Sequence, residues 1–192
     1  KGTQIIFSDI GTPSSEKNKF TVYDYIKNNL TERGIPEDEI CFIHDAKTEI
    51  QRDKMFEEVR QGSKRIIIGS TQKMGTGTNI QDKLVALHHV DCPFRPSDIE
   101  QREGRILRQG NKNEEVNIYR YVTKDTFDAY LWQMVENKQK FISQVMTSKV
   151  PLRNCEDIDD TVLSFAEDSY SIRLFKLFNA SSCSSIISRS IS

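Results

Sequence analysis

The chain has 192 residues, of which 36% are hydrophobic and 29% are charged, and this apolar share excludes wholesale disorder. The 27 basic and 28 acidic residues give a net charge of −1, so bulk charge does not argue for a nucleic-acid or membrane partner. Any anion site therefore has to come from local clustering. No apolar run approaches the ~18 residues of a membrane span and no signal-peptide pattern is present, so we expect no membrane partner and a cytoplasmic location. The chain begins at Lys1 rather than Met, which indicates a piece of a longer polypeptide.

The cysteines and histidines show no metal-ligand spacing. The histidines are His44 and the adjacent pair His88 and His89. The cysteines are scattered, with no Cys-x-x-Cys pair: Cys41, Cys92, Cys155 and Cys183. We therefore expect no metal site, and reduced thiols in a cytosolic setting.

Strand and helix patterns alternate through residues 1–150. Short apolar runs predict strands at residues 4–9, 40–44, 65–70, 84–90 and 116–122. Apolar residues at three- and four-residue spacing predict helices between Phe20 and Gly34 and at residues 47–61, 98–109 and 125–146. Apolar strands separated by helices are typical of a parallel sheet covered on both faces. Ligands of such sheets bind at the carboxyl ends of the strands, so the loops after Ser70 and Val90 are the candidate site.

The pattern weakens after residue 150. An acidic patch around Glu156, helical spacing over residues 165–178 and a Ser-rich end follow. We expect one domain over residues 1–150. Residues 151–192 are expected to be an acidic linker with one further helix and a frayed tail.

The first stretch that could carry chemistry is residues 69–80, directly after a predicted strand. It holds Gly75 and Gly77, several hydroxyls and Lys73. Glycines let a backbone approach an anion closely, and amides with hydroxyls bind phosphate oxygens. No Gly-Lys-Ser/Thr triplet occurs in the chain, so this is not a Walker A loop. The alternative is a tight turn with no ligand.

The second stretch is residues 101–110. On the predicted helix, Gln101, Arg105 and Arg108 share one face, and two arginines on one stripe suit a triphosphate. The alternative is a solvated helix face on which Glu100 and Glu103 are the partners. An interior Gly104 argues against that alternative, because glycine costs up to ~1 kcal/mol in a helix.

The order of these segments resembles motifs IV, V and VI of superfamily-two helicases. Ile5-Ile6-Phe7-Ser8 stands first, then Ser70-Thr71 through Gly75-x-Gly77-x-Asn79, and last Gln101-x-x-Gly104-Arg105-x-x-Arg108-x-Gly110. The spacing is similar to the second RecA-like lobe of the Swi/Snf-like branch. Asn111 stands where that branch has Gln. Residues 126–143 resemble the helicase part of large bacterial mobile-element and phage proteins that also carry a DNA methyltransferase.

The resemblance implies a fold, a chemistry and a set of roles. The fold would be a RecA-like three-layer α/β/α lobe with a mainly parallel sheet, followed by a long C-terminal helix. ATP and Mg²⁺ would be held mainly by an N-terminal lobe, and the partners would be that lobe, DNA and a fused methyltransferase in a bacterial cytoplasm. The arginine fingers would be Arg105 and Arg108. The residues beside the nucleotide would be Gln101, Gly75, Gly77 and Asn79. The nucleic-acid contacts would be Ser70, Thr71, Lys73 and Ser8.

The chain lacks a Walker A loop, a Walker B box and a methyltransferase tetrapeptide. We therefore expect it to be inactive alone, although part of an ATP-hydrolysing enzyme. Two other interpretations stay open. One is a stand-alone α/β module that binds a phosphorylated small molecule through residues 71–79. The other is a silent scaffold lobe that docks partners through the helix at residues 125–146.

Overall fold

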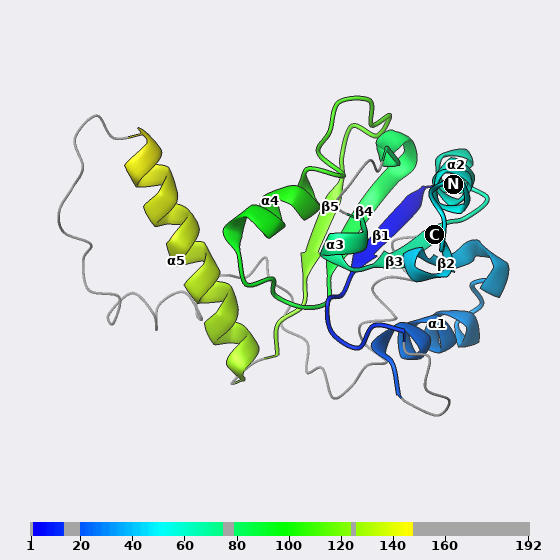
Figure 1. Cartoon of the computed structure of the whole chain (residues 1–192), viewed down its shortest axis with the longest axis horizontal. Coiled ribbons are helices and arrows are strands. Elements are labelled where there is room, and N and C mark those ends of the chain that lie inside the picture. Colours follow the sequence, from blue (N-terminus) through cyan, green and yellow to red (C-terminus); the bar gives the residue numbers. More distant parts are fainter. Residues whose placement is uncertain (1, 14–19, 75–78, 124–125, 148–192) are drawn as a thin grey trace.

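A computed structural model describes residues 2–13, 20–74, 79–123 and 126–147 (Figure 1). The strands are β1 (Thr3–Phe7), β2 (Ile40–Phe42), β3 (Ile66–Gly69), β4 (Leu84–His89) and β5 (Asn117–Arg120). The α-helices are α1 (Val22–Glu32), α2 (Glu49–Gln61), α3 (Thr71–Met74), α4 (Pro96–Glu103) and α5 (Phe127–Thr147). Short 3₁₀ turns cover Glu37–Glu39, Ile43–Asp45 and Gln81–Lys83. The linker, helix and tail predicted for residues 151–192 lie outside the described residues.

The five strands form one sheet in the order β2-β3-β1-β4-β5, and every pairing is parallel. The central strand β1 pairs Ile5 with Ile67 of β3 and with Leu87 of β4. These residues are completely buried, as expected for strands with helices on both sides. The predicted parallel α/β sheet is confirmed.

Alternation along the strands divides the core between the two faces of the sheet. Ile6 and Ile68 pack with Tyr23, Ile26 and Leu30 of α1. Their strand neighbours, such as Ile5 and Ile67, face the opposite layer and pack with α2 and α3. The helix residues of that layer are Phe56, Val59 and Met74. This is the predicted three-layer α/β/α arrangement of a RecA-like lobe.

Local sequence signals set the helix boundaries near the core. Thr48 and Gln51 form a capping box at the start of α2, and Gly62 ends it in the left-handed conformation at φ 84°. Thr21 caps α1 by accepting a hydrogen bond from the backbone N–H of Asp24.

Within the described residues, no helix is both long enough and apolar enough to cross a membrane.

The long helix α5 packs beside α4 at the β5 edge of the lobe (Figure 1). Trp132 and Val135 of α5 form a third apolar cluster with Ile99 of α4 and with Val122. Another part of α5 is exposed and apolar, including Phe141 and Met146. The predicted long C-terminal helix is therefore confirmed.

The helix predicted for residues 98–109 is wrong at its end, because α4 stops at Glu103. Gly104 is its C-cap and not an interior residue. A Cβ at this position would lie 2.9 Å from the carbonyl oxygen of Glu100, so the chain needs glycine where it leaves the helix. Arg105 and Arg108 consequently do not share a helical face with Gln101, and the interior-glycine argument does not hold.

Candidate functional site

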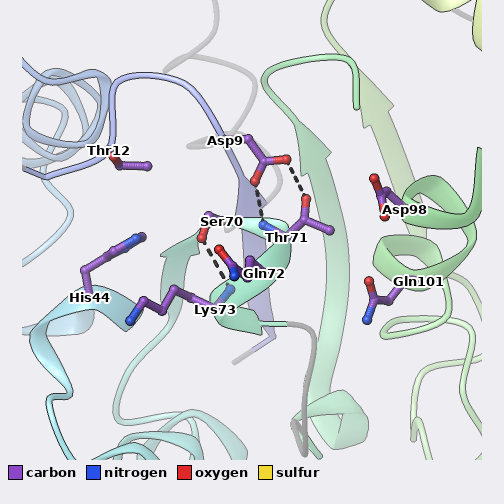
Figure 2. A pocket seen from close by; sticks show the side chains of 9 residues that line it. All are labelled: Asp9, Thr12, His44, Ser70, Thr71, Gln72, Lys73, Asp98 and Gln101. Carbon is purple, nitrogen blue, oxygen red and sulfur yellow. Dashed lines mark hydrogen bonds between the residues drawn. The ribbon is translucent and has the colours of Figure 1, made fainter. Parts of the chain in front are cut away.

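A cavity of about 640 Å³ opens where β1 and β3 end and the loops after them begin (Figure 2). Ser70, Thr71, Gln72 and Lys73 border it from the segment after β3. The other lining residues come from the loop after β1, from the turn after β2 and from α4: Asp9, Thr12, His44, Asp98 and Gln101. The carboxyl ends of parallel strands therefore place the polar cluster where the topology predicts a ligand site.

Asp9 holds the start of the segment after β3. One carboxylate oxygen accepts the backbone N–H of Thr71 at 2.6 Å, and the other accepts its hydroxyl at 2.8 Å (Figure 2). A threonine has only these two donors, so both donors of Thr71 are directed at one side chain. The side chain of Asp9 nevertheless remains 41% exposed.

Arg102 of α4 lies at the centre of a buried ion-pair cluster behind this contact. Its guanidinium is fully buried, and one nitrogen lies 2.7 Å from a carboxylate oxygen of Asp9 and 3.0 Å from one of Asp91. Its Nε donates to the hydroxyl oxygen of Thr71 at 2.7 Å. The other nitrogen donates to the backbone oxygen of Asp91, and the planar group stands 5.2 Å from the ring centroid of Phe7. Buried arginines are found where partners of this kind neutralise the charge.

His89 continues the cluster toward β5. Its Nδ1 lies 3.4 Å from a guanidinium nitrogen of Arg102, and its Nε2 lies 3.3 Å from Glu103. Burial lowers the pKa of His89, and the charges of Arg102 and Arg120 lower it further, against the opposing effect of Glu103. A neutral ring can accept at Nδ1 from Arg102, whereas its buried Nε2 faces Glu103 without forming a hydrogen bond.

His44 and Lys73 supply the basic side of the cavity. Burial lowers the pKa of His44, and the charge of Lys73 lowers it further, so His44 is neutral at pH 7. Lys73 is exposed and its side chain lines the cavity (Figure 2). The cavity therefore offers one full positive charge against the carboxylates of Asp9 and Asp98.

Arg105 and Arg108 lie on the turn formed by residues 104–110, here named the arginine turn. Its core residue Ile106 is buried in the same apolar layer as Leu84 and Met74. The Gln81 side chain donates to the carbonyl of Gln109 at 3.2 Å, which joins the arginine turn to the 3₁₀ turn Gln81–Lys83 before β4. Burial lowers the pKa of Arg105, and the nearby charge of Arg108 lowers it further.

Asn111 fastens the arginine turn to the sheet. Its side-chain amide donates to the carbonyl of Leu84 at 2.9 Å and to that of Ile106 at 3.1 Å. The asparagine that replaces the usual glutamine of the resembling family thus has a defined structural role in this chain. Arg108 on the same turn is exposed, and Arg105 is half-buried.

The structure distributes the predicted site residues over several environments. Ser70, Thr71, Lys73 and Gln101 line one cavity, whereas Arg105 and Arg108 lie on the arginine turn. Asn79 is exposed, and its carbonyl accepts a hydrogen bond from Arg60 at 3.0 Å. Gly75 and Gly77 lie outside the described residues.

Ser8 does not reach the surface that a ligand would meet. It is fully buried, its hydroxyl donates to the carbonyl of Ile10, and its own carbonyl accepts the hydroxyl of Tyr23 at 2.6 Å. The resemblance to helicase motif IV implied a nucleic-acid contact for Ser8. The side chain is instead turned into the protein, where it fixes the loop that carries Asp9.

Sequence reasoning missed Asp9, Asp91 and Arg102. A signal was present, because Asp9 and Asp91 each follow closely on a strand, and β1 and β4 are neighbours in a parallel sheet. The carboxyl ends of neighbouring parallel strands meet at one edge, so two acidic residues there predict a shared cationic partner. Arg102 was passed over because charge alone does not distinguish a buried arginine from a surface one.

Comparison with known proteins gives a family for most of the sheet-forming part of the chain and a solved structure with a similar fold. Residues 5–110, more than half of the chain, match the family described as the helicase conserved C-terminal domain. The C-terminal part of the Fun30 ATPase domain, known from a crystal structure, has a similar fold, with a TM-score of 0.54 and 24% identity. That similarity covers 70% of this chain and 39% of the solved one.

Three curated proteins are similar in sequence. The Defense against restriction protein B of Escherichia phage P1 is 28% identical over 110 residues, which are 57% of this chain and 5% of that protein. The ATP-dependent RNA helicase eIF4A of Schizosaccharomyces pombe is 30% identical over 53% of this chain and 24% of its own length. The uncharacterized ATP-dependent helicase YqhH of Bacillus subtilis is 26% identical over 64% of this chain and 23% of its own length. The chain therefore spans at most about a quarter of these relatives, and it belongs to the helicase conserved C-terminal domain family.

Proposed function

We propose that the chain is the C-terminal motor lobe of an ATP-dependent DNA helicase or translocase of the Swi/Snf-like branch. ATP would lie between this lobe and an N-terminal RecA-like lobe of the same polypeptide. The observation that carries the proposal is the arginine turn, which holds two mutually repelling arginines within the segment that matches the family. A multiply charged phosphate anion would relieve that repulsion.

Arg105 and Arg108 would act by electrostatics. ATP supplies the phosphoryl group, and the two guanidinium groups would stabilise the negative charge that develops on it. Gln101, Gly75, Gly77 and Asn79 are proposed to lie beside the nucleotide. Mg²⁺ would be held mainly by the N-terminal lobe, and in the described part of this chain no group of three or more His, Cys, Asp or Glu side chains could hold a metal ion.

The cavity beside β3 would contact the nucleic-acid backbone. Lys73 is an exposed cation there, and Ser70 and Gln72 add polar groups from the same segment. Contacts of this type bind phosphates without reading sequence. The preference for DNA rests on the Swi/Snf-like form of the motifs, and the fused DNA methyltransferase rests on the resemblance of residues 126–143. A comparison of ATPase stimulation by single-stranded DNA and RNA tests the first of these.

The arginine assignment is tested in the polypeptide that joins this chain to its N-terminal lobe. We expect Arg105→Ala and Arg108→Ala each to lower DNA-stimulated ATP turnover by about 10³-fold or more, as in related NTPases, while ATP binding persists. Arg33→Ala is the control, because Arg33 follows α1 on the opposite face of the sheet. Turnover that is unchanged in either variant would contradict the assignment.

The isolated chain offers a second test. We expect no measurable ATP hydrolysis by it, with or without DNA, because its sequence lacks the Walker motifs. Hydrolysis that survives purification to homogeneity and disappears in Arg108→Ala would show that this chain alone holds the nucleotide.

A further inference from the structure

The carboxylate of Asp9 lies where several hydrogen-bond donors converge. Its carboxylate accepts the backbone N–H and the hydroxyl of Thr71, and it accepts from the guanidinium of Arg102 at 2.7 Å. Backbone N–H groups, threonine hydroxyls and arginines are the donors that proteins direct at nucleic-acid phosphates. The anion that holds these donors in this structure is a side chain of the chain itself.

The contact makes Thr71 unavailable to any other anion. Its hydroxyl has a single hydrogen, which is donated to Asp9, while the hydroxyl oxygen accepts from Nε of Arg102. A phosphate in the cavity would also meet the negative charge of Asp9 directly, because that carboxylate lines the cavity. Thr71 and a phosphate therefore cannot pair until the Asp9 side chain moves.

The geometry allows the side chain to move while its backbone stays fixed. Asp91 accepts the backbone N–H groups of both Asp9 and Ile10, so the loop after β1 is anchored independently of the Asp9 carboxylate. Arg102 would keep Asp91 as its counter-ion at 3.0 Å. The Asp9 side chain is 41% exposed, whereas that of Asp91 is only 9% exposed. The Asp9 carboxylate can therefore rotate into solvent and be hydrated there, and the Asp91 carboxylate cannot.

We propose that Asp9 competes with a nucleic-acid backbone phosphate for the donors of Thr71, so that a strand engages Thr71 only when the Asp9 carboxylate has left. This inference rests on the proposed function. It adds that Asp9 sets the affinity of the same cavity for a nucleic-acid strand. In the free protein Asp9 lowers that affinity. In the bound protein the phosphate replaces it on Thr71.

The test measures binding of a fluorescent single-stranded oligonucleotide to the full polypeptide without ATP, by anisotropy. Asp9→Asn keeps the shape and removes the competing charge. We expect it to bind about tenfold more tightly, the equivalent of one charge-assisted hydrogen bond gained. Asp98→Asn is the matched control, because it removes one negative charge from the same cavity without a contact to Thr71. We expect a gain of about twofold from it. Equal gains in the two variants would overturn the proposal.

A double-mutant cycle gives a second readout. Thr71→Val should weaken binding less than about twofold in the wild-type background, where Asp9 already occupies the hydroxyl, and about tenfold in the Asp9→Asn background. An equal effect in both backgrounds would overturn the proposal. Thermal melting checks that each variant is folded, and Asp9→Ser replaces Asp9→Asn if the latter is not.

Lys73→Gln separates this proposal from the proposed function. If the wild type binds the strand and Lys73→Gln weakens it, the cavity contacts nucleic acid, and the Asp9 comparison stands or fails on its own. If the wild type does not bind the strand at all, both the nucleic-acid function and the competition by Asp9 are wrong.

Discussion

Arg102 and Arg108 belong to one short stretch of sequence, yet they lie in opposite environments. Arg102 is fully buried at the end of α4, where Asp9, Asp91 and Thr71 take up its donors. Arg108 is exposed on the arginine turn, and its charge disfavours the charge of Arg105. The comparison shows that Arg102 is held in a buried ion-pair cluster at the strand edge, whereas Arg108 is exposed at the surface, where we propose that it meets an external anion.

The largest stability effect should come from Arg102. Arg102→Met leaves two carboxylates without their cation, and breaking a buried pair in this way costs roughly 3–5 kcal/mol in the free energy of unfolding. Arg108→Met should change it by less than about 0.5 kcal/mol, as is usual for a surface position. Urea denaturation of both variants measures the difference. Similar values for the two would remove the distinction between a structural arginine and a surface one.

The stability of the protein should depend on pH because His88 is buried in the sheet. Burial lowers the pKa of His88 to about 3, and the neighbouring His89 contributes to this. Between pH 6.5 and 3 the unfolded chain therefore binds a proton that the folded chain excludes, so stability is complete above about pH 6.5 and falls below it. At about 1.4 kcal/mol per pH unit, the loss at pH 5 is about 2 kcal/mol.

His88→Gln provides the control for this titration. The imidazole of His88 contacts the Tyr121 hydroxyl at 2.9 Å and the Gln4 side chain at 3.0 Å, and a glutamine amide offers a donating NH₂ group and an accepting oxygen in its place. The decline in unfolding free energy from pH 7 to pH 5 should be shallower in the variant. The same decline in both proteins would mean that another group carries the pH dependence.

The smallest effect concerns the attachment of the arginine turn. Asn111→Ala removes the hydrogen bonds to Leu84 and Ile106, so we expect a loss of about 1 kcal/mol in stability. We also expect an approximately tenfold decrease in ATP turnover, because Arg105 and Arg108 lose their fixed orientation. Asn29→Ala, which removes one side-chain hydrogen bond on α1, should alter stability alone. Unaltered turnover in Asn111→Ala would show that the turn holds its shape without this residue.

The strands and most helices were predictable because each has a strong local pattern. Ile66–Ile68 and Ile5–Phe7 are apolar throughout, and Gly62 marks the end of α2. The end of α4 was not predictable by the same method. Residues 98–109 keep a helical spacing of apolar and charged side chains, but the bonds of Asn111 and the packing of Ile106 on β4 replace the last turns of the helix.

The candidate site was only partly predictable for a related reason. The segment after β3 could be singled out because its glycines and hydroxyls are close in sequence. The partner of Asp9 could not be predicted, because Arg102 is remote along the chain and meets Asp9 only after β1, β4 and α4 have assembled.

The amino-acid sequence by itself determined the layered α/β architecture and the identity of the segments that resemble helicase motifs, since both are encoded in short-range patterns of apolar, glycine and charged residues. Only the tertiary structure decided which arginine is buried, which donors of Thr71 are occupied and which side chains border the cavity. Those outcomes depend on the parallel sheet, which brings the ends of separate strands to one edge and lets desolvation and charge pairing choose among residues of the same type.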